Sequence, residues 1–189
     1  MKKILLLIVL FVPIFSNGQT LQELYDKLVS NNKNEVSKLQ FKLVSYDIVT
    51  INSTSNEFWK GGSSREAIYV KLPVGTLKWY YRITLMEVEQ NYFYNTNETL
   101  ISLLQNNNPL FVNNQTSLGV NFYIINDYAK NDFLSGRTFN HYSAYQNENT
   151  RGFNGICDLT FSNLMICLKN NNLKNGLKAI VEVVAYGNF

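Results

Sequence analysis

The sequence has few of the residues on which enzyme active sites most often depend. His141 is its only histidine, and Cys157 and Cys167 are its only cysteines. Catalysis by a Ser-His-Asp or Cys-His arrangement needs a base beside the nucleophile. His141 lies in a polar segment, where a solvent-facing side chain is the simpler expectation. Two cysteines and one histidine are also too few for a structural zinc site. We therefore expect no metal and no cofactor.

Motifs that bind phosphate or activate a serine are missing from the chain as well. It contains neither a P-loop, nor a G-x-G-x-x-G turn, nor a G-x-S-x-G elbow. The sequence also lacks a calcium loop of the EF-hand type, because it contains no D-x-[DN]-x-[DN]-G motif. The sequence thus gives no scaffold for nucleotide binding or for serine hydrolase chemistry.

The N-terminus has the pattern of a secretory signal peptide. Lys2 and Lys3 form a basic start, and the apolar run Ile4–Phe15 follows. Ser16 and Gly18 then occupy the small-x-small positions of a cleavage site. The run is too short to span a bilayer as a mature helix. No cysteine near this point could carry a lipid anchor. An uncleaved N-terminal anchor is the alternative.

Cleavage after residue 18 leaves residues 19–189, which are enough for one domain with a substantial core. The formal net charge falls from +3 to +1, because Lys2 and Lys3 are lost and no acidic residue is lost with them. A nearly neutral chain without basic clusters is not expected to bind nucleic acid. No later segment approaches eighteen consecutive apolar residues, so we expect no transmembrane segment after cleavage. The expected location is secreted, periplasmic or at the cell envelope.

The rest of the chain has mostly the period of β-strands. A short amphipathic helix is expected from Leu21 to about Val29, and alternation then takes over from residue 38 with a change of phase near Val44. Short helices are expected at about 97–105 and 127–135, the second with Asp127 as its N-cap and Gly136 just past its end. Residues 52–66 and 137–155 are expected to be loops. This pattern predicts a single antiparallel β-sandwich, or jelly-roll-like fold, with small helical insertions.

The segment TLKWYYRIT, residues 76–84, places three aromatic residues side by side. Alternation assigns Leu77, Trp79, Tyr81 and Ile83 to the core face. Tyr80 is then expected on the outer face, where Lys78 and Arg82 can lie along its ring.

The two cysteines are candidates for a disulfide. The segment CDLTFSNLMIC, residues 157–167, has apolar runs on both sides of Ser162 and Asn163 and is typical of a hairpin. A three-residue turn would set Cys157 opposite Cys167, whereas a two-residue turn would place them on opposite faces. Reduced, buried cysteines are the alternative.

Aromatic residues outside the expected strands are the best candidates for ligand binding. They form three groups: Phe58 with Trp59, the segment 92–94, and Phe139 with Tyr142 and Tyr145. Each group could instead fold back over an end of the sandwich. Phe58 and Trp59 beside a Gly-Gly pair are the leading candidates, because adjacent rings in an extended segment are difficult to bury together. Tyr142 and Tyr145 are the next candidates.

The order of the strands from residue 65 to 187 resembles that of Golgi-dynamics (GOLD) β-sandwiches. The shared features are Leu77 and Trp79 two positions apart, Phe122 and Ile124 in the next strand, an apolar strand from Ile166 to Asn170 that includes Cys167, and the alternating Val181 and Val183. The expected helical insertions and the leading helix depart from that family. The resemblance implies a non-catalytic module that contacts protein or lipid.

The favoured function is therefore a non-catalytic binding module for a protein, glycan or lipid partner. One alternative is a secreted hydrolase of the glycosidase type, which would need paired carboxylates and no histidine. Its candidates are Glu57, Glu66, Glu87, Glu89, Asp127 and Asp132. Another alternative is a structural component of a surface assembly.

Overall fold

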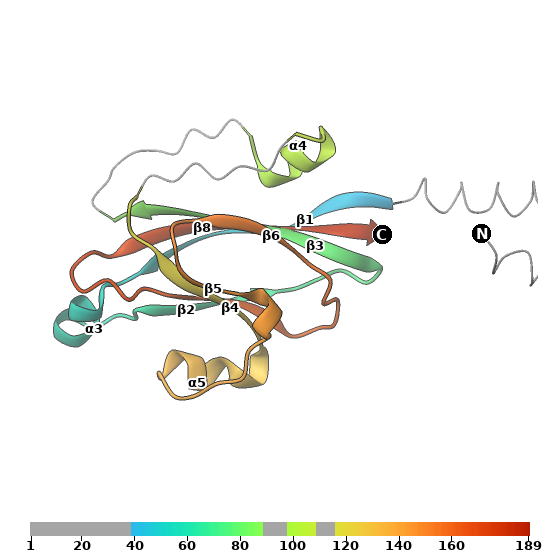
Figure 1. Cartoon of the computed structure of the whole chain (residues 1–189). Helices are drawn as coiled ribbons and strands as arrows, with labels where there is room; N and C mark the ends of the chain where they lie inside the picture. The colour runs from blue at the N-terminus through green and yellow to red at the C-terminus, as the bar shows by residue number, and fades with distance from the viewer. Residues whose placement is uncertain (1–38, 89–97, 109–115) are drawn as a thin grey trace, which may run out of the picture. The chain divides into compact units, whose positions relative to one another are not determined.

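Figure 1 shows the chain as a computed structural model, which describes residues 39–88, 98–108 and 116–189. Residues 40–189 form one compact unit. The expected signal peptide and the helix expected after it lie outside the described residues. Within the described ranges, no helix is both long and apolar enough to cross a membrane.

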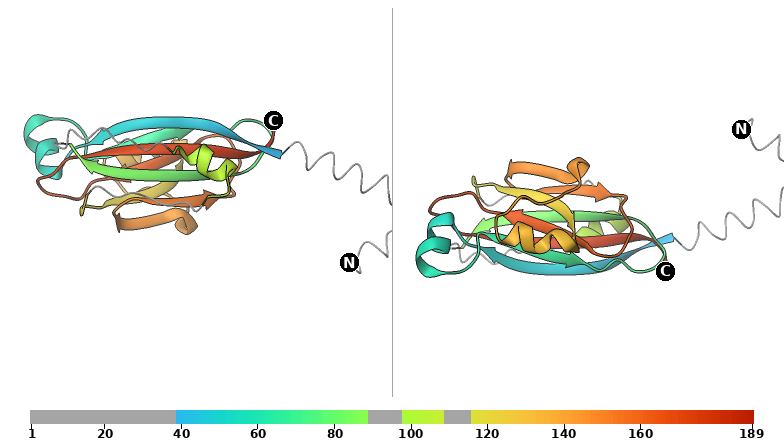
Figure 2. Two further views of the ribbon diagram at one scale, coloured as in Figure 1. Left: turned by 90° about the horizontal axis from the view of Figure 1, so that it is seen from above. Right: turned by 90° about the horizontal axis from the view of Figure 1, so that it is seen from below.

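Two four-stranded sheets form the unit, and their inner faces share one core (Figures 1 and 2). The first sheet has the order β1 (Leu39–Ile51), β8 (Leu177–Asn188), β3 (Thr76–Glu87) and β6 (Phe153–Cys157). The second has the order β2 (Arg65–Val70), β7 (Leu164–Lys169), β4 (Val120–Asn126) and β5 (Gln146–Thr150). The pairs β2–β7, β3–β6, β3–β8, β4–β5 and β4–β7 are all antiparallel. The predicted β-sandwich is confirmed.

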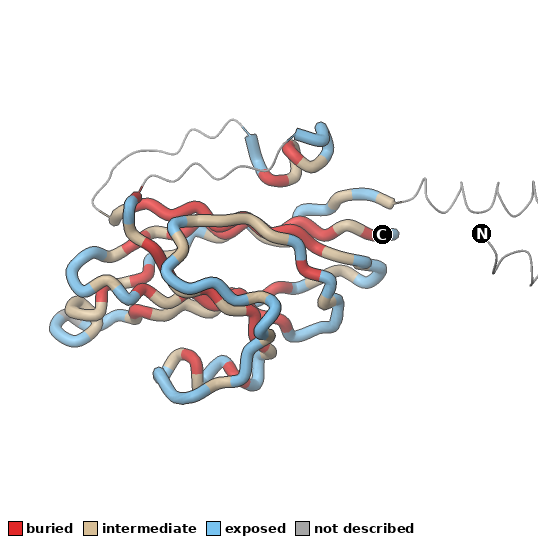
Figure 3. Tube along the Cα trace, in the orientation of Figure 1, coloured by how far each residue is buried: buried red, intermediate tan, exposed pale blue. Residues whose placement is uncertain are grey.

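Alternation along the central strands builds the core, and the buried positions follow these strands in Figure 3. Trp79, Tyr81 and Ile83 of β3 face inward, as the sequence predicted, and are at most 5% exposed. The ring of Tyr81 stacks on that of Phe122 from the other sheet, with centroids 5.1 Å apart. Large apolar and aromatic side chains buried from both sheets supply most of the stabilisation of such a fold.

The first residues of β3 do not follow the prediction. Leu77 is 58% exposed, because the register between β3 and β8 shifts between Thr76 and Lys78. Tyr80 is buried rather than exposed, since helix α4 (Leu100–Gln105) covers the outer face there and packs Leu100 into the same cluster. The expected contact of Lys78 with the ring of Tyr80 is confirmed, with Nζ 5.5 Å from the centroid. Arg82 instead forms a buried ion pair, described below.

The hairpin predicted for residues 157–167 is wrong. Cys157 ends β6 in the first sheet and Cys167 lies in β7 of the second sheet, so the connection crosses from one sheet to the other. Cys157 packs in the core between the sheets. Cys167 lies on the outer face of the second sheet, in the cluster that includes Phe133 of helix α5 (Lys130–Leu134). Both cysteines are free.

The expected loop 137–155 contains two strands. β5 pairs with β4, β6 pairs with β3, and the connection through Arg151 and Gly152 links the two sheets on this side. Gly152 takes a φ of +117°, which favours glycine in so short a connection. The loop expected at residues 52–66 likewise contains a helix, α3 (Thr54–Lys60).

Both predicted short helices are present, with different starts. α4 begins at Leu100, and the hydroxyl of Thr99 accepts the backbone N–H of Ser102 at 3.3 Å. The segment expected to be a helix from Asp127 forms the 3-10 turn η2 (Asp127–Ala129) followed by α5. Its N-cap is Asn126 rather than Asp127.

Candidate functional site

Helix α3 holds Phe58 and Trp59 at one end of the sandwich (Figure 1). The buried Ser53 caps the helix, and its hydroxyl accepts the backbone N–H of Asn56 at 3.1 Å. The backbone N–H groups of Thr54 and Ser55 donate to the carbonyls of Asn172 and Leu173, each at 3.1 Å. The first turn of α3 is thereby fixed to the loop between β7 and β8.

The residues that follow α3 in the chain are also constrained. Gly62 has a φ of +96°, and a Cβ at this position would lie 2.2 Å from the side-chain nitrogen of Asn52. The backbone N–H of Asn52 donates to the carbonyl of Ser63 at 2.9 Å. The positive φ favours glycine at position 62, and the Asn52–Ser63 hydrogen bond holds the chain just after α3 against the end of β1.

Phe58 and Trp59 are 78% and 79% exposed. Their ring centroids lie 4.9 Å apart with an interplanar angle of 83°, an edge-to-face contact. Residues three and four positions apart share a helix face, so both rings lie on the side of Ser55, whose N–H donates to the carbonyl of Leu173. The side chain of Leu173 is 67% exposed. We call Phe58, Trp59 and Leu173 the aromatic tip.

Asn170, which ends the apolar strand noted in the sequence, orders the loop that supports the aromatic tip, a role that the sequence pattern does not indicate. It is fully buried at the end of β7. Its side-chain nitrogen donates to the carbonyls of Ile51 and Asn175, and its side-chain oxygen accepts the backbone N–H of Asn172 at 2.9 Å. Asn172 in turn accepts from Thr54 of α3. Because the chain is rich in asparagine, composition hides the structural role of this residue.

Tyr142 and Tyr145 lie away from the aromatic tip. Tyr142 is the N-cap of the 3-10 turn η3 (Ser143–Tyr145), Tyr145 is its last residue, and both pack against the core. The hydroxyl of Tyr145 bonds to Asp158 in the loop between β6 and β7, whereas the aromatic tip lies beside the loop at the other end of β7. The hydrogen bond to the Asp158 carboxylate raises the pKa of Tyr145 to about 12. The structure therefore does not bring the four sequence candidates together.

The ring of Tyr142 lies 5.8 Å from that of Phe161, centroid to centroid, and contributes to the cover of the core. Phe139 belongs to an aromatic cluster on the outer face of the second sheet, with its ring centroid 5.2 Å from that of Tyr123 and 5.7 Å from that of His141. The aromatic segment 92–94 lies outside the described residues.

The two cysteine thiols are not suited to nucleophilic chemistry. Burial raises the pKa of the Cys157 thiol to about 11, and it raises the pKa of Cys167 as well. A thiol with a raised pKa carries little thiolate, which is the reactive form. In the part of the chain that the structure describes, no group of three or more His, Cys, Asp or Glu side chains could hold a metal ion.

The carboxylates considered for hydrolysis are distributed over several elements. Glu57 lies on α3, Glu66 on β2, Glu87 at the end of β3, Asp127 on η2 and Asp132 on α5, where Asp132 pairs with Arg137 at 2.9 Å. Glu89 is outside the described residues. Burial raises the pKa of the half-buried Glu66.

Comparison of the chain with models of protein families, with characterised proteins and with solved structures finds no match. The resemblance to GOLD β-sandwiches therefore stays a prediction, and the geometry of the aromatic tip is the strongest guide to function.

Proposed function

We propose that the chain is a secreted or cell-envelope binding module without catalytic activity, and that its protein, glycan or lipid partner contacts the aromatic tip. The observation that carries the proposal is the adjacent exposure of Phe58 and Trp59 on a helix fixed at both ends. Large aromatic side chains held in place on a surface are typical of interfaces, because they bury much apolar area at low cost in conformational entropy.

The angle between the two rings favours an apolar partner surface over a flat ligand. A sugar ring can stack on one aromatic face, but two rings at 83° do not form a continuous platform. An apolar pocket of a protein, or the interface of a lipid bilayer, would cover both rings and Leu173 together.

Trp59 provides a direct measurement of binding. The chain has two tryptophans, and the other one, Trp79, is fully buried with its indole N–H donating to the carbonyl of Leu159 at 2.8 Å. Acrylamide quenching of the native protein should therefore report on Trp59. We expect a blue shift and protection from quenching with one of three probes: phosphatidylcholine–phosphatidylglycerol vesicles, a panel of soluble glycans, or fractionated envelope proteins.

The variant that tests the site is Phe58→Ala combined with Trp59→Ala. We expect it to lose retention on the probe that protects Trp59, while its melting temperature stays close to that of the wild type because both side chains are exposed. The matched control is Tyr128→Ala, which removes a ring that is 70% exposed on η2. Retention of the double variant at the wild-type level would overturn the proposal. Assaying the glycan incubations for released reducing ends tests the alternative hydrolase.

A further inference from the structure

β1 is a long edge strand with one side open to a further strand. It spans 13 residues and pairs with β8 as its neighbour in the sheet order. Within the described residues no strand follows it on the other side. The strand at the opposite edge of this sheet, β6, has only five residues. The two views of Figure 2 show β1 along one margin of the unit.

Apolar side chains are prominent along this edge, and its only charged residues are Lys42 and Asp47. Leu43, Tyr46 and Ile48 are 48%, 49% and 63% exposed. An open edge presents unpaired backbone N–H and C=O groups, and exposed apolar side chains beside them add the burial that makes pairing favourable.

A change of phase places these side chains on a single face. Phe41 contacts Tyr80 and Tyr186 on the outer face, whereas Val44 and Val49 pack into the core. Positions 44 and 49 would lie on opposite faces in a regular strand, so the strand contains one extra residue, a β-bulge. We place the bulge at Val44–Ser45, where two successive residues are half-buried.

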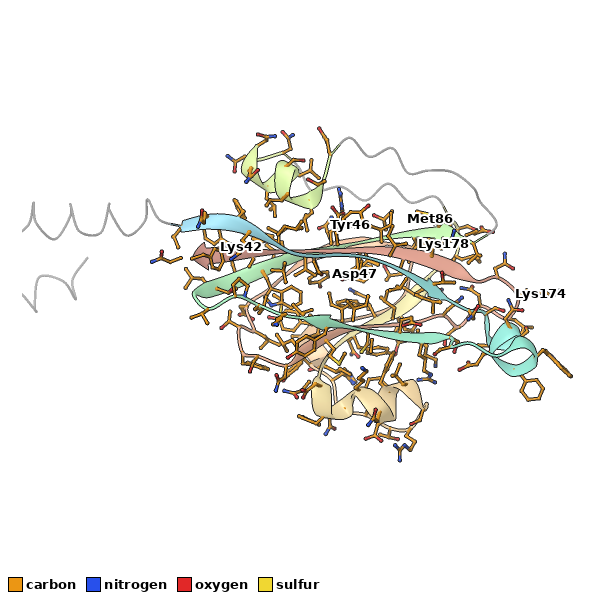
Figure 4. All side chains as sticks on the ribbon, turned by 180° about the vertical axis from the view of Figure 1, so that it is seen from behind. Lys42, Tyr46, Asp47, Met86, Lys174 and Lys178 are labelled. Atoms are coloured by element: carbon orange, nitrogen blue, oxygen red, sulfur yellow. The ribbon has the colours of Figure 1, made fainter. Side chains whose placement is uncertain are left out.

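After the bulge, even-numbered residues take the outer face that odd-numbered residues take before it. Tyr46 and Ile48 therefore share the outer face with Phe41 and Leu43. Asp47 shares the inner face with Lys42. Figure 4 shows Tyr46 and Asp47 on opposite sides of β1.

The edge is complementary to itself. If two copies of β1 run antiparallel about an axis at Val44–Ser45, Lys42 of each copy faces Asp47 of the other, so that opposite charges meet twice on the inner face. On the outer face, Leu43 faces Tyr46 of the second copy, and Phe41 faces Ile48 of the second copy. Each facing pair consists of residues on the same face, as cross-strand pairing requires.

We propose that β1 pairs with β1 of a second copy of this chain, which joins the two first sheets into one continuous sheet across a two-fold axis. The second copy is the occupant that the charges select, because the paired positions carry Lys42 and Asp47 in a self-complementary order. A closed two-fold pairing also covers the open edge completely and so prevents further association.

Sedimentation of the purified protein, as its host processes it, tests the pairing over a range of concentrations. We expect a dimer. Tyr46→Lys combined with Ile48→Lys should produce a folded monomer, because both side chains are exposed in the single copy, and its melting temperature should no longer depend on protein concentration. A wild-type protein that stays monomeric at every concentration would overturn the proposal, even if a foreign extended peptide adds to β1.

Charge reversal tests the register. Lys42→Asp and Asp47→Lys should each raise the dimer dissociation constant about tenfold, because like charges then face each other twice. The combined Lys42→Asp and Asp47→Lys variant restores both opposite-charge pairs and should return to within about threefold of the wild type. The control is Lys71→Asp, an exposed position just after β2, which should leave the dimer unchanged. Single reversals without effect, or a double variant as weak as the singles, would overturn the proposed pairing.

Discussion

Arg82 and Glu182 face each other across β3 and β8 and form a buried ion pair beneath α4. The register places them directly opposite, with Nε of Arg82 2.5 Å from Oε2 of Glu182 and both side chains less than 5% exposed. The other carboxylate oxygen of Glu182 accepts the backbone N–H of Leu100 at 2.9 Å, and the guanidinium also donates to the carbonyl of Glu98. The pair thus fixes the start of α4 to the outer face of the first sheet.

Removing one member of this pair should be costly. Glu182→Ala leaves the Arg82 charge buried without its carboxylate and the N–H of Leu100 without its acceptor. We expect a loss of about 3–5 kcal/mol in the free energy of unfolding, measured by urea denaturation. The matched control is Asp132→Asn, which breaks the exposed pair with Arg137 and should cost less than about 1 kcal/mol. Equal costs for the two variants would contradict this account.

Asn170 should matter both for stability and for the aromatic tip. Asn170→Ala leaves the carbonyls of Ile51 and Asn175 and the N–H of Asn172 without their partner. We expect a cost of about 2–4 kcal/mol and faster hydrogen exchange at residues 53–60, because the loop that anchors α3 loses its order. The exposed neighbour provides the control, since Asn171→Ala should change neither quantity. Unchanged exchange in α3 would show that Asn170 does not support the tip.

The sandwich could be predicted because its central strands alternate regularly. Trp79, Tyr81 and Ile83 reach the core in the predicted phase. β5 was missed because it is an edge strand whose residues are almost all polar and exposed, so it has no apolar period. The burial of Tyr80 depends on α4, a cover that comes from elsewhere in the chain and leaves no mark on the strand itself.

The candidate site could be predicted in part. Adjacent rings at Phe58 and Trp59 identified the exposed pair, although the segment was expected to be a loop and forms a helix. The crossing between Cys157 and Cys167 could not be predicted, because apolar runs around a turn look the same whether the chain returns in one sheet or passes to the other. Opposite charges at Arg82 and Glu182 are a pairing signal, but one that is useful only once the register of β3 and β8 is known.

The thiols of Cys157 and Cys167 should stay reduced and hidden in the native protein. One lies between the sheets and the other on the outer face of the second sheet. We expect no reaction with a thiol reagent under native conditions, two thiols per chain after denaturation, and the same melting temperature with and without dithiothreitol. A melting temperature lowered by dithiothreitol would reveal a disulfide and contradict the positions of these residues.

Glu66 should make stability depend on pH. Burial raises its pKa in the folded chain above the ordinary value of 4.5, so the folded state holds this proton more tightly than the unfolded state. The stability contributed by this proton is therefore greatest below the unfolded pKa and decreases as the pH rises through the folded pKa.

Glu66→Gln removes the charge, and we expect the free energy of unfolding of this variant to match that of the wild type near pH 4 and to exceed it at pH 7. The gain should stay below about 1 kcal/mol, because solvent reaches the half-buried carboxyl. The exposed Glu148→Gln controls for the loss of one negative charge. Urea denaturation between pH 4 and pH 7 measures the difference, and a variant that gains most at low pH would contradict the sign.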